Sequence, residues 1–147
     1  MLTIQIRRLA SAEGLSLPAY MTAGAAGMDL HAAIVDAVVI DPGAIVLVPT
    51  GFEVAIPNGF EGQVRPRSGL AVKHGISLPN TPATIDSDYR GEIRVPLINL
   101  GREPFRVTRA MRIAQLVVAP VVRVAWSEVA ELPATDRAAR GFGHSGV

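Results

Sequence analysis

The chain reads VVIDPGAIVLVPTGFEVAIPNG from residue 38 to residue 59. Runs rich in β-branched residues at 38–40, 45–48 and 52–56 alternate here with the turn tripeptides DPG, PTG and PNG. Short strands separated by proline and glycine turns, at a spacing of about ten residues, are typical of a β sandwich or barrel. The stretch therefore predicts three consecutive strands, with a break at PTG.

The same pattern continues toward both ends of the chain. A loop is predicted over 11–24, and further strands over 2–9, 27–32, 62–65, 76–78, 92–100, 105–108 and 113–124. Only residues 68–74 allow a helix, of about two turns. With 14 Gly, 11 Pro and no sustained helical period, the chain is predicted to be all-β, most simply a jelly-roll-like barrel or sandwich.

Length and composition indicate one soluble globular domain. The chain has 147 residues, of which 49% are hydrophobic and 18% charged, with a net charge of +1. This length allows a sizeable core, and the near-neutral charge gives no indication of stable nucleic-acid binding. Because no stretch approaches the roughly 20 apolar residues of a membrane span and no signal peptide is evident, we expect no membrane association and a cytoplasmic location.

The residue types that bind transition metals are scarce. Cysteine is absent, and the three histidines, His31, His74 and His144, are scattered along the chain. Thiolate sites are therefore excluded and a zinc site is not indicated. We expect any metal to be bound by oxygen and to be brought largely by the substrate.

The composition changes after Pro133. Residues 134–147 consist mainly of glycine, alanine and polar residues, so they cannot form a core element. The sequence predicts a β domain over 1–133, followed by a mobile C-terminal arm over 134–147. Phe142 between two glycines suggests that the arm closes over a site; the alternative is a frayed tail.

A polar segment, LPNTPATIDSDYRG at 78–91, is the candidate site. Its prolines restrict the backbone, and Asp86 and Asp88 are followed directly by Tyr89. One alternative is that the aspartates cap a turn while Tyr89 covers the edge of the core. Cations and a hydroxyl at 65–70 favour a site instead, because carboxylate, guanidinium and hydroxyl groups can bind a base and a polyphosphate and attack it with water.

Five motifs follow one another along the chain. They are AGMDLHA at 26–32, PRSGLA at 66–71, Asn80 with TIDSDYRG at 84–91, RIAQL at 112–116, and the arm at 137–146. In this order and spacing they resemble the trimeric deoxyuridine triphosphate nucleotidohydrolase (dUTPase) family. The resemblance implies a jelly-roll homotrimer with shared active sites, each closed by an arm from another subunit. It also implies hydrolysis of dUTP to dUMP and pyrophosphate with Mg²⁺, which limits uracil incorporation into DNA.

The resemblance assigns the chemistry to the polar segment. Asp86 would deprotonate the water that attacks the α-phosphorus in line. Asn80, with backbone groups near Thr84 and Ile85, would read the uracil edge, and a cytosine would leave a donor and an acceptor unpaired. Tyr89 would pack on the deoxyribose, where a 2′-hydroxyl would clash.

Further roles are implied for residues that bind the phosphates. Arg67, Ser68 and the Gly69 amide resemble the phosphate cradle. Gln115 would order phosphates or metal-bound waters. Asp29 would act on Mg²⁺ through water, with the ion held mainly by the substrate phosphates.

In the arm, the resemblance implies that Arg137 clamps phosphate, Phe142 stacks on uracil and Ser145 takes the γ-phosphate. The family's last motif usually has glycine at the positions of Ala138 and Arg140. If either position requires a positive φ, the substitution strains the closed arm.

Two other functions stay open. A dCTP deaminase of the same fold carries an Arg-Ser-Ser motif and a catalytic glutamate on the strand after the hairpin. Here the corresponding residues are Arg67-Ser68-Gly69 and Pro96, and proline cannot activate water. On that strand, Arg94 is implied to contact the substrate. The other alternative is a catalytically silent, nucleotide-binding regulatory trimer, against which Asp86 argues because a pure binder needs no base.

Overall fold

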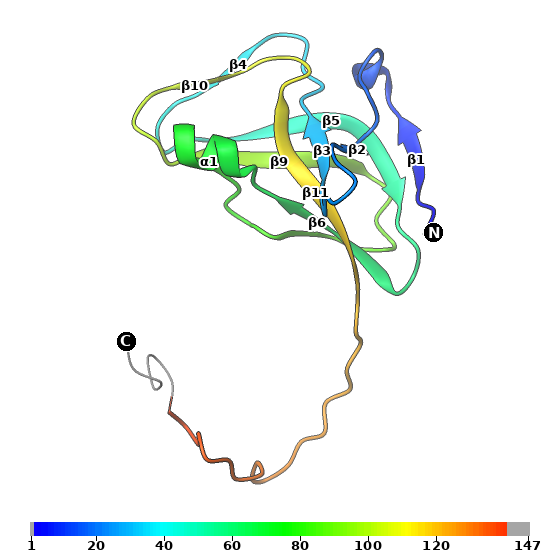
Figure 1. Ribbon diagram of the computed structural model, residues 1–147, viewed down its shortest axis with the longest axis vertical. Coiled ribbons are helices and arrows are strands. Elements are labelled where there is room, and N and C mark those ends of the chain that lie inside the picture. The colour runs from blue at the N-terminus through cyan, green and yellow to red at the C-terminus, as the bar shows by residue number, and fades with distance from the viewer. Residues whose placement is uncertain (1, 141–147) are drawn as a thin grey trace.

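In a computed structural model, which describes residues 2–140, the chain is built almost entirely of antiparallel strands (Figure 1). The strands are β1 (Gln5–Arg8), β2 (Ala19–Tyr20), β3 (Met28–His31), β4 (Val38–Ile40), β5 (Ile45–Ala55), β6 (Phe60–Arg65), β7 (Ile76–Ser77), β8 (Ala83–Ile85), β9 (Glu92–Asn99), β10 (Phe105–Val107) and β11 (Arg112–Pro120). The helices are η1 (Ala10–Ala12) and α1 (Ser68–His74). The all-β prediction and the predicted helix are confirmed.

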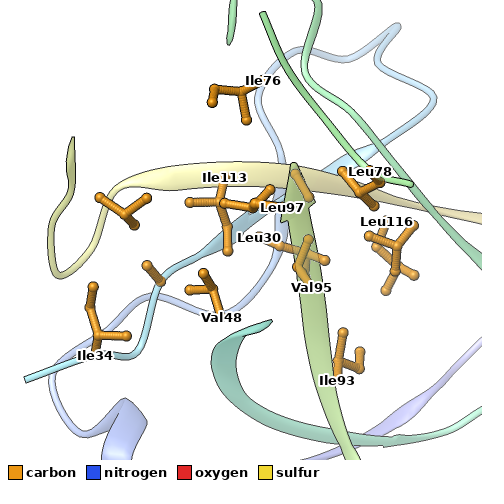
Figure 2. Packing of buried hydrophobic residues seen from close by; sticks show 14 of the residues in the cluster. Leu30, Ile34, Val48, Ile76, Leu78, Ile93, Val95, Leu97, Ile113 and Leu116 are labelled. Carbon is orange, nitrogen blue, oxygen red and sulfur yellow. The ribbon is translucent and has the colours of Figure 1, made fainter. Parts of the chain in front are cut away.

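The strands form a four-stranded sheet β1-β5-β9-β7, a five-stranded sheet β2-β3-β11-β6-β8 and a two-stranded ribbon β10-β4. In β9, Ile93, Val95 and Leu97 are buried at every second position, as expected for side chains that alternate across a strand. They meet Leu30 and Leu116 of the other large sheet in the core (Figure 2). Burying each such side chain contributes about 1.5–3 kcal/mol. The sheets thus form a sandwich, in agreement with the prediction.

The tripeptide PTG at 49–51 does not end a strand. The two strands predicted on either side of it form one strand, β5, of 11 residues, so the predicted break is wrong. The register with β9 shifts between Pro49 and Glu53, which is how a bulge accommodates irregular residues within a ladder. The buried Thr50 hydroxyl donates to the Ile93 carbonyl at 2.7 Å, so a contact with β9 stabilises the irregular backbone.

Other boundaries differ from the predicted ones. The predicted loop over 11–24 contains β2 and the end of η1. The strand predicted over 113–124 ends at Pro120, and residues 121–140 are exposed and contain no strand. The partner strand β6 begins at Phe60, opposite Pro120, and the Val121 N–H donates to the Gly59 carbonyl, so β11 ends where its partner does. Figure 1 shows the segment running away from the sandwich; that the mobile arm begins at 134 stays a prediction.

The polar segment at 78–91 connects the two large sheets. Within it, β8 forms the outer edge of the five-stranded sheet and pairs with β6, and the chain then turns into β9 of the other sheet. The Thr81-Pro82 peptide bond is cis. Neither helix of residues 2–140 has the length and apolar composition that crossing a membrane requires.

Candidate active site

A cavity of about 310 Å³ lies where β8 and the turn after it face β9. Its lining consists of Leu47, Val64, Asn80, Ala83, Thr84, Ile85, Asp86, Tyr89, Glu92, Ile93 and Arg94. This lining includes the polar-segment residues predicted to contact the base and the sugar, Asn80, Thr84, Ile85 and Tyr89, together with the predicted general base Asp86 and the predicted substrate contact Arg94 on β9. The fold therefore gathers these residues around one space.

Strand β8 supplies one wall of the cavity. It is hydrogen-bonded to β6 on one side and is the terminal strand of its sheet. The backbone groups on the open side of an edge strand have no partner strand, so they can bind a ligand edge. Side chains alternate along β8, so that Thr84 is exposed while Ile85 is buried in the core. The buried Ile85 side chain anchors the strand at the cavity.

The turn after β8 is closed without help from its carboxylates. The Tyr89 amide donates to the Asp86 carbonyl at 3.2 Å, and the Arg90 guanidinium donates to the Ser87 carbonyl at 2.7 Å and the Tyr89 carbonyl at 2.8 Å. Among residues 2–140, the carboxylates of Asp86 and Asp88 make no hydrogen bond or ion pair. This geometry speaks against the alternative in which they cap the turn.

Asp86 also lies at the rim of a second cavity, of about 540 Å³. This cavity is lined in part by Asp88 and by Val121 and Arg123, the first residues of the exposed C-terminal segment. The C-terminal segment therefore begins close to the predicted general base. Arg123 was not among the residues predicted from the sequence, because a single arginine in an apolar run carries no motif.

Tyr89 is 45% exposed, yet its orientation is defined. Its hydroxyl donates to the Glu92 carbonyl at 3.0 Å. The Glu92 carboxylate in turn accepts the Gly51 N–H at 2.8 Å and the Nε of Arg94 at 2.9 Å. Glu92 had no role in the sequence predictions, because its contact with Gly51 of β5 depends on the fold.

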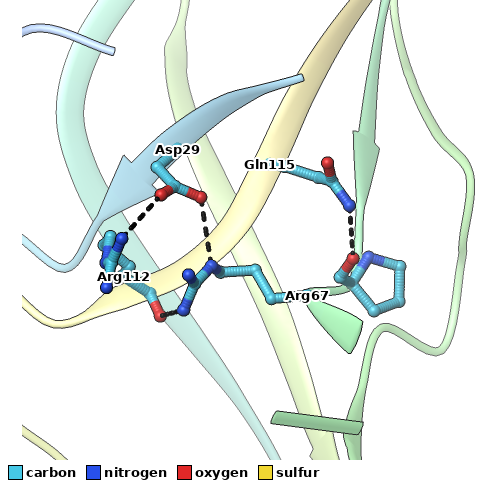
Figure 3. Close-up of polar contacts among 5 residues, drawn as sticks. Asp29, Arg67, Arg112 and Gln115 are labelled. Carbon is cyan, nitrogen blue, oxygen red and sulfur yellow. Dashed lines mark hydrogen bonds and ion pairs between the residues drawn. The ribbon is translucent and has the colours of Figure 1, made fainter. Parts of the chain in front are cut away.

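A second group of site residues surrounds Asp29 on β3. One carboxylate oxygen accepts a hydrogen bond from Arg67 Nε at 3.0 Å and the other accepts one from Arg112 Nη1 at 3.2 Å (Figure 3). Arg67 Nη1 also donates to the Arg112 carbonyl at 3.4 Å. Asp29 is only 9% exposed, so the guanidinium groups compensate a largely desolvated charge. Arg112 lies in the quoted RIAQL motif, but no role was predicted for it.

Gln115 holds the backbone where β6 leads into α1. Its Nε2 donates to the Pro66 carbonyl at 2.9 Å. Figure 3 shows this hydrogen bond of Gln115 as a dashed line. Gly27 lies close by, and a Cβ at this glycine would come within 2.5 Å of Gln115 Oε1. Ser68 and Gly69 follow as the exposed first residues of α1, where backbone N–H groups have no partner within the helix.

Among residues 2–140, three groups have shifted pKa values. Burial lowers the pKa of His31, Asp29 opposes the shift, and the guanidinium groups paired with Asp29 lower it further. Within the described residues, the buried Nδ1 of His31 has no hydrogen-bond partner. Away from the site, the hydrogen bond between Arg7 and Glu53 raises the pKa of Arg7 and lowers that of Glu53.

The predicted site is therefore divided within one chain. The Asp29 group and the first residues of α1 do not line the 310 Å³ cavity. Arg137 lies in the exposed C-terminal segment, where its Nε donates to the Arg140 carbonyl at 2.9 Å. The predicted roles of Phe142 and Ser145 fall outside residues 2–140.

The family model for dUTPase matches residues 14–146. The chain belongs to the dUTPase family. It is 61% identical over 135 residues to the deoxyuridine 5′-triphosphate nucleotidohydrolase of Desulfotalea psychrophila, covering 92% of this chain and 90% of that relative. It is 53% identical over 146 residues to the protein of the same name from Caldanaerobacter subterraneus subsp. tengcongensis, covering 99% of both.

The fold is also that of a solved dUTPase. The structure of Staphylococcus bacteriophage 80alpha dUTPase with dUPNHPP matches with a TM-score of 0.89 at 24% identity, covering 100% of both chains. The predicted family and the predicted class of enzyme, a dUTP diphosphatase, are confirmed. Membership in the dUTPase family favours neither the deaminase nor the silent regulatory trimer.

Proposed function

We propose that this dUTPase-family chain hydrolyses dUTP to dUMP and pyrophosphate with Asp86 as the general base. The proposal rests on one observation: the Asp86 carboxylate is exposed in the cavity and has no partner among the described residues. A base must be free to accept a hydrogen bond from the attacking water. Asp86 takes the proton of that water as its oxygen bonds to the α-phosphorus. The bond from the α-phosphorus to the bridging oxygen then breaks, and pyrophosphate leaves.

The cavity lining supports selection of the base and the sugar. The open edge of β8 and the Asn80 side chain offer donors and acceptors for the uracil edge. A cytosine would reverse one donor and one acceptor, which leaves buried groups unpaired and costs about 1–3 kcal/mol. The Tyr89 ring supplies a flat surface against which deoxyribose packs and a 2′-hydroxyl clashes.

The phosphates would be bound by the residues around α1. Arg67 uses Nε and Nη1 within the Asp29 group, which leaves Nη2 for a phosphate oxygen. The Ser68 hydroxyl and the Gly69 amide are exposed beside it. A guanidinium and helix N–H groups are suited to phosphate because both donate to anionic oxygens.

The chain offers few direct ligands for a magnesium ion. Within residues 2–140 no group of three or more His, Cys, Asp or Glu side chains is arranged to hold a metal, and both oxygens of Asp29 are engaged. This donor set fits an ion held mainly by the triphosphate, with Asp29 and Gln115 contacting it through water. When bound, Mg²⁺ supplies positive charge that offsets the charge of the phosphates.

A homotrimer with shared sites completes the proposal. Leu47, which lines the cavity, is 54% exposed, and Ile45 on the same face of β5 is 56% exposed. In the C-terminal segment, Val122 and Trp126 are 85% and 94% exposed. Exposed apolar residues in this quantity are typical of a protein interface. A site at a subunit interface would combine the cavity of one subunit with the Asp29 group and α1 of another, and an arm from another subunit would close it.

Pyrophosphate release from dUTP, dCTP, dTTP and UTP, each with and without Mg²⁺, tests the proposed activity. We expect hydrolysis of dUTP far above that of the other nucleotides, and a strong dependence on Mg²⁺. Comparable rates for dUTP and dCTP would contradict the proposed recognition of the uracil edge by Asn80 and β8. Formation of dUTP from dCTP would identify a deaminase.

A further inference from the structure

Gly91, at the end of the polar segment, has no room for a side chain. A Cβ at this position would lie 2.4 Å from the hydroxyl oxygen of Tyr89, 2.6 Å from its Cζ and 3.0 Å from its Cε2. The φ angle of Gly91 is not in the left-handed region, unlike that of Gly51 or Gly75. Other residue types can adopt this backbone conformation. Glycine is needed here because the Tyr89 ring occupies the space that a side chain at position 91 would fill.

The ring is held at its hydroxyl end and lies over this glycine. The hydrogen bond from the Tyr89 hydroxyl to the Glu92 carbonyl, at 3.0 Å, spans Gly91. Glu92 is itself attached to β5 through the Gly51 N–H. Since Tyr89 is 45% exposed, core packing alone does not determine where the ring lies. Its position depends on the hydrogen bond and on the open space above Gly91.

We infer that Gly91 is a positioning residue that sets the discrimination between deoxyribose and ribose by fixing the Tyr89 ring. The inference rests on the proposed function, in which this ring packs on the sugar. A methyl group at position 91 would displace the ring and break its hydrogen bond to Glu92. A wall that rejects a 2′-hydroxyl must be held at a defined distance from the sugar, so a displaced ring loses selectivity.

A double-mutant cycle on the full-length chain tests the inference. Gly91→Ala is compared in the wild-type and Tyr89→Ala backgrounds, with Gly24→Ala as the control, because a Cβ at Gly24 would meet nothing within 4 Å. We expect Gly91→Ala to lower the ratio of kcat/KM for dUTP to that for UTP by about tenfold or more, equivalent to about 1.4 kcal/mol. We expect no further change in that ratio when Tyr89 is already alanine, and none from Gly24→Ala.

The kinetic and stability results distinguish a failure of the inference about Gly91 from a failure of the proposed contact between Tyr89 and the sugar. An unchanged dUTP/UTP ratio in folded Gly91→Ala, or an equal loss in the Tyr89→Ala background, overturns the inference. If Gly91→Ala fails to fold, recovery of Tm in the double variant supports the clash with the ring, and failure to recover overturns it. Wild-type selectivity in Tyr89→Ala alone would instead refute the proposed contact of Tyr89 with the sugar.

Discussion

The Asp29 carboxylate accepts a hydrogen bond from Arg67 Nε at 3.0 Å and thereby ties β3 to the turn that precedes α1. Arg112 occupies the other oxygen at 3.2 Å. Each of these oxygens keeps a second lone pair, which can accept a hydrogen bond from a water molecule bound to a metal. In this arrangement Asp29 orients Arg67, which the proposed function assigns to the phosphates.

The variant Asp29→Asn tests whether Asp29 acts by orienting Arg67 or by contacting the metal. We expect kcat/KM for dUTP to fall by about tenfold to a hundredfold, because a charge-assisted hydrogen bond contributes about 1.5–3 kcal/mol. The loss should persist at saturating Mg²⁺, and the affinity for dUDP measured in EDTA should fall as well. Glu53→Gln, which removes the carboxylate paired with Arg7, is the control. Full recovery at high Mg²⁺ would assign Asp29 to the metal.

Asp86→Asn should retain the fold and nucleotide binding while kcat falls steeply. Loss of a positioned general base lowers the rate by about two to four orders of magnitude. Asp88→Asn is a matched control, since Asp88 lies in the same turn but does not line the cavity around Asn80. Steady-state kinetics and Tm of both variants give the answer. A kcat of Asp86→Asn close to that of wild type would show that Asp86 is not the base.

A chain that ends at Ala139 should stay folded and keep its oligomeric state, because it retains the buried core and the exposed apolar residues Val122 and Trp126. It should lose most of its activity, since it lacks Phe142 and Ser145, which are predicted to contact the substrate. Light scattering and dUTP hydrolysis measure the two properties. Full activity of the shortened chain would show that the end of the arm is a frayed tail with no role in catalysis.

Mixing two defective chains tests whether sites are shared between subunits. Asp86→Asn has an intact arm, and the chain that ends at Ala139 has an intact base. If the arm acts on another subunit, co-refolding the two in equal amounts should restore up to about a quarter of the sites through random assembly. If the arm acts within its own chain, the mixture should be no more active than the separate variants.

Ala138 has a φ of 46°, in the left-handed region that disfavours side chains. This conformation costs a non-glycine residue about 1–2 kcal/mol. Ala138→Gly should relieve this strain, but it also increases the entropy of the open arm by about 0.4–1 kcal/mol, so kcat/KM should stay within about tenfold of wild type. Ala139→Gly has only the entropic penalty. We therefore expect kcat/KM to be higher for Ala138→Gly than for Ala139→Gly. The reverse order would contradict a left-handed conformation of Ala138 in the working enzyme.

Local patterns in the sequence were sufficient for the class of fold and for naming candidate site residues, whose roles stay predictions. Alternation of apolar and polar residues reports which face of a strand is buried, and this is why β9 was predicted correctly. The segment at 78–91 was identified for a similar reason: its prolines, carboxylates and tyrosine are neighbours in the chain, so their association needs no long-range contact. The order of the motifs was sufficient for the family.

The tertiary structure alone decided the features that depend on residues far apart in the chain. Strand β5 continues through the PTG tripeptide because Thr50 is held by Ile93 on a neighbouring strand. Asp29 is paired with Arg67 and Arg112 because β3, the turn before α1 and β11 are brought together by folding. No local pattern encodes such partners, since each hydrogen bond depends on sheet order and register. The sequence determined which chemical groups are present, and packing determined which of them have partners within residues 2–140 and which, such as the Asp86 carboxylate, have none there.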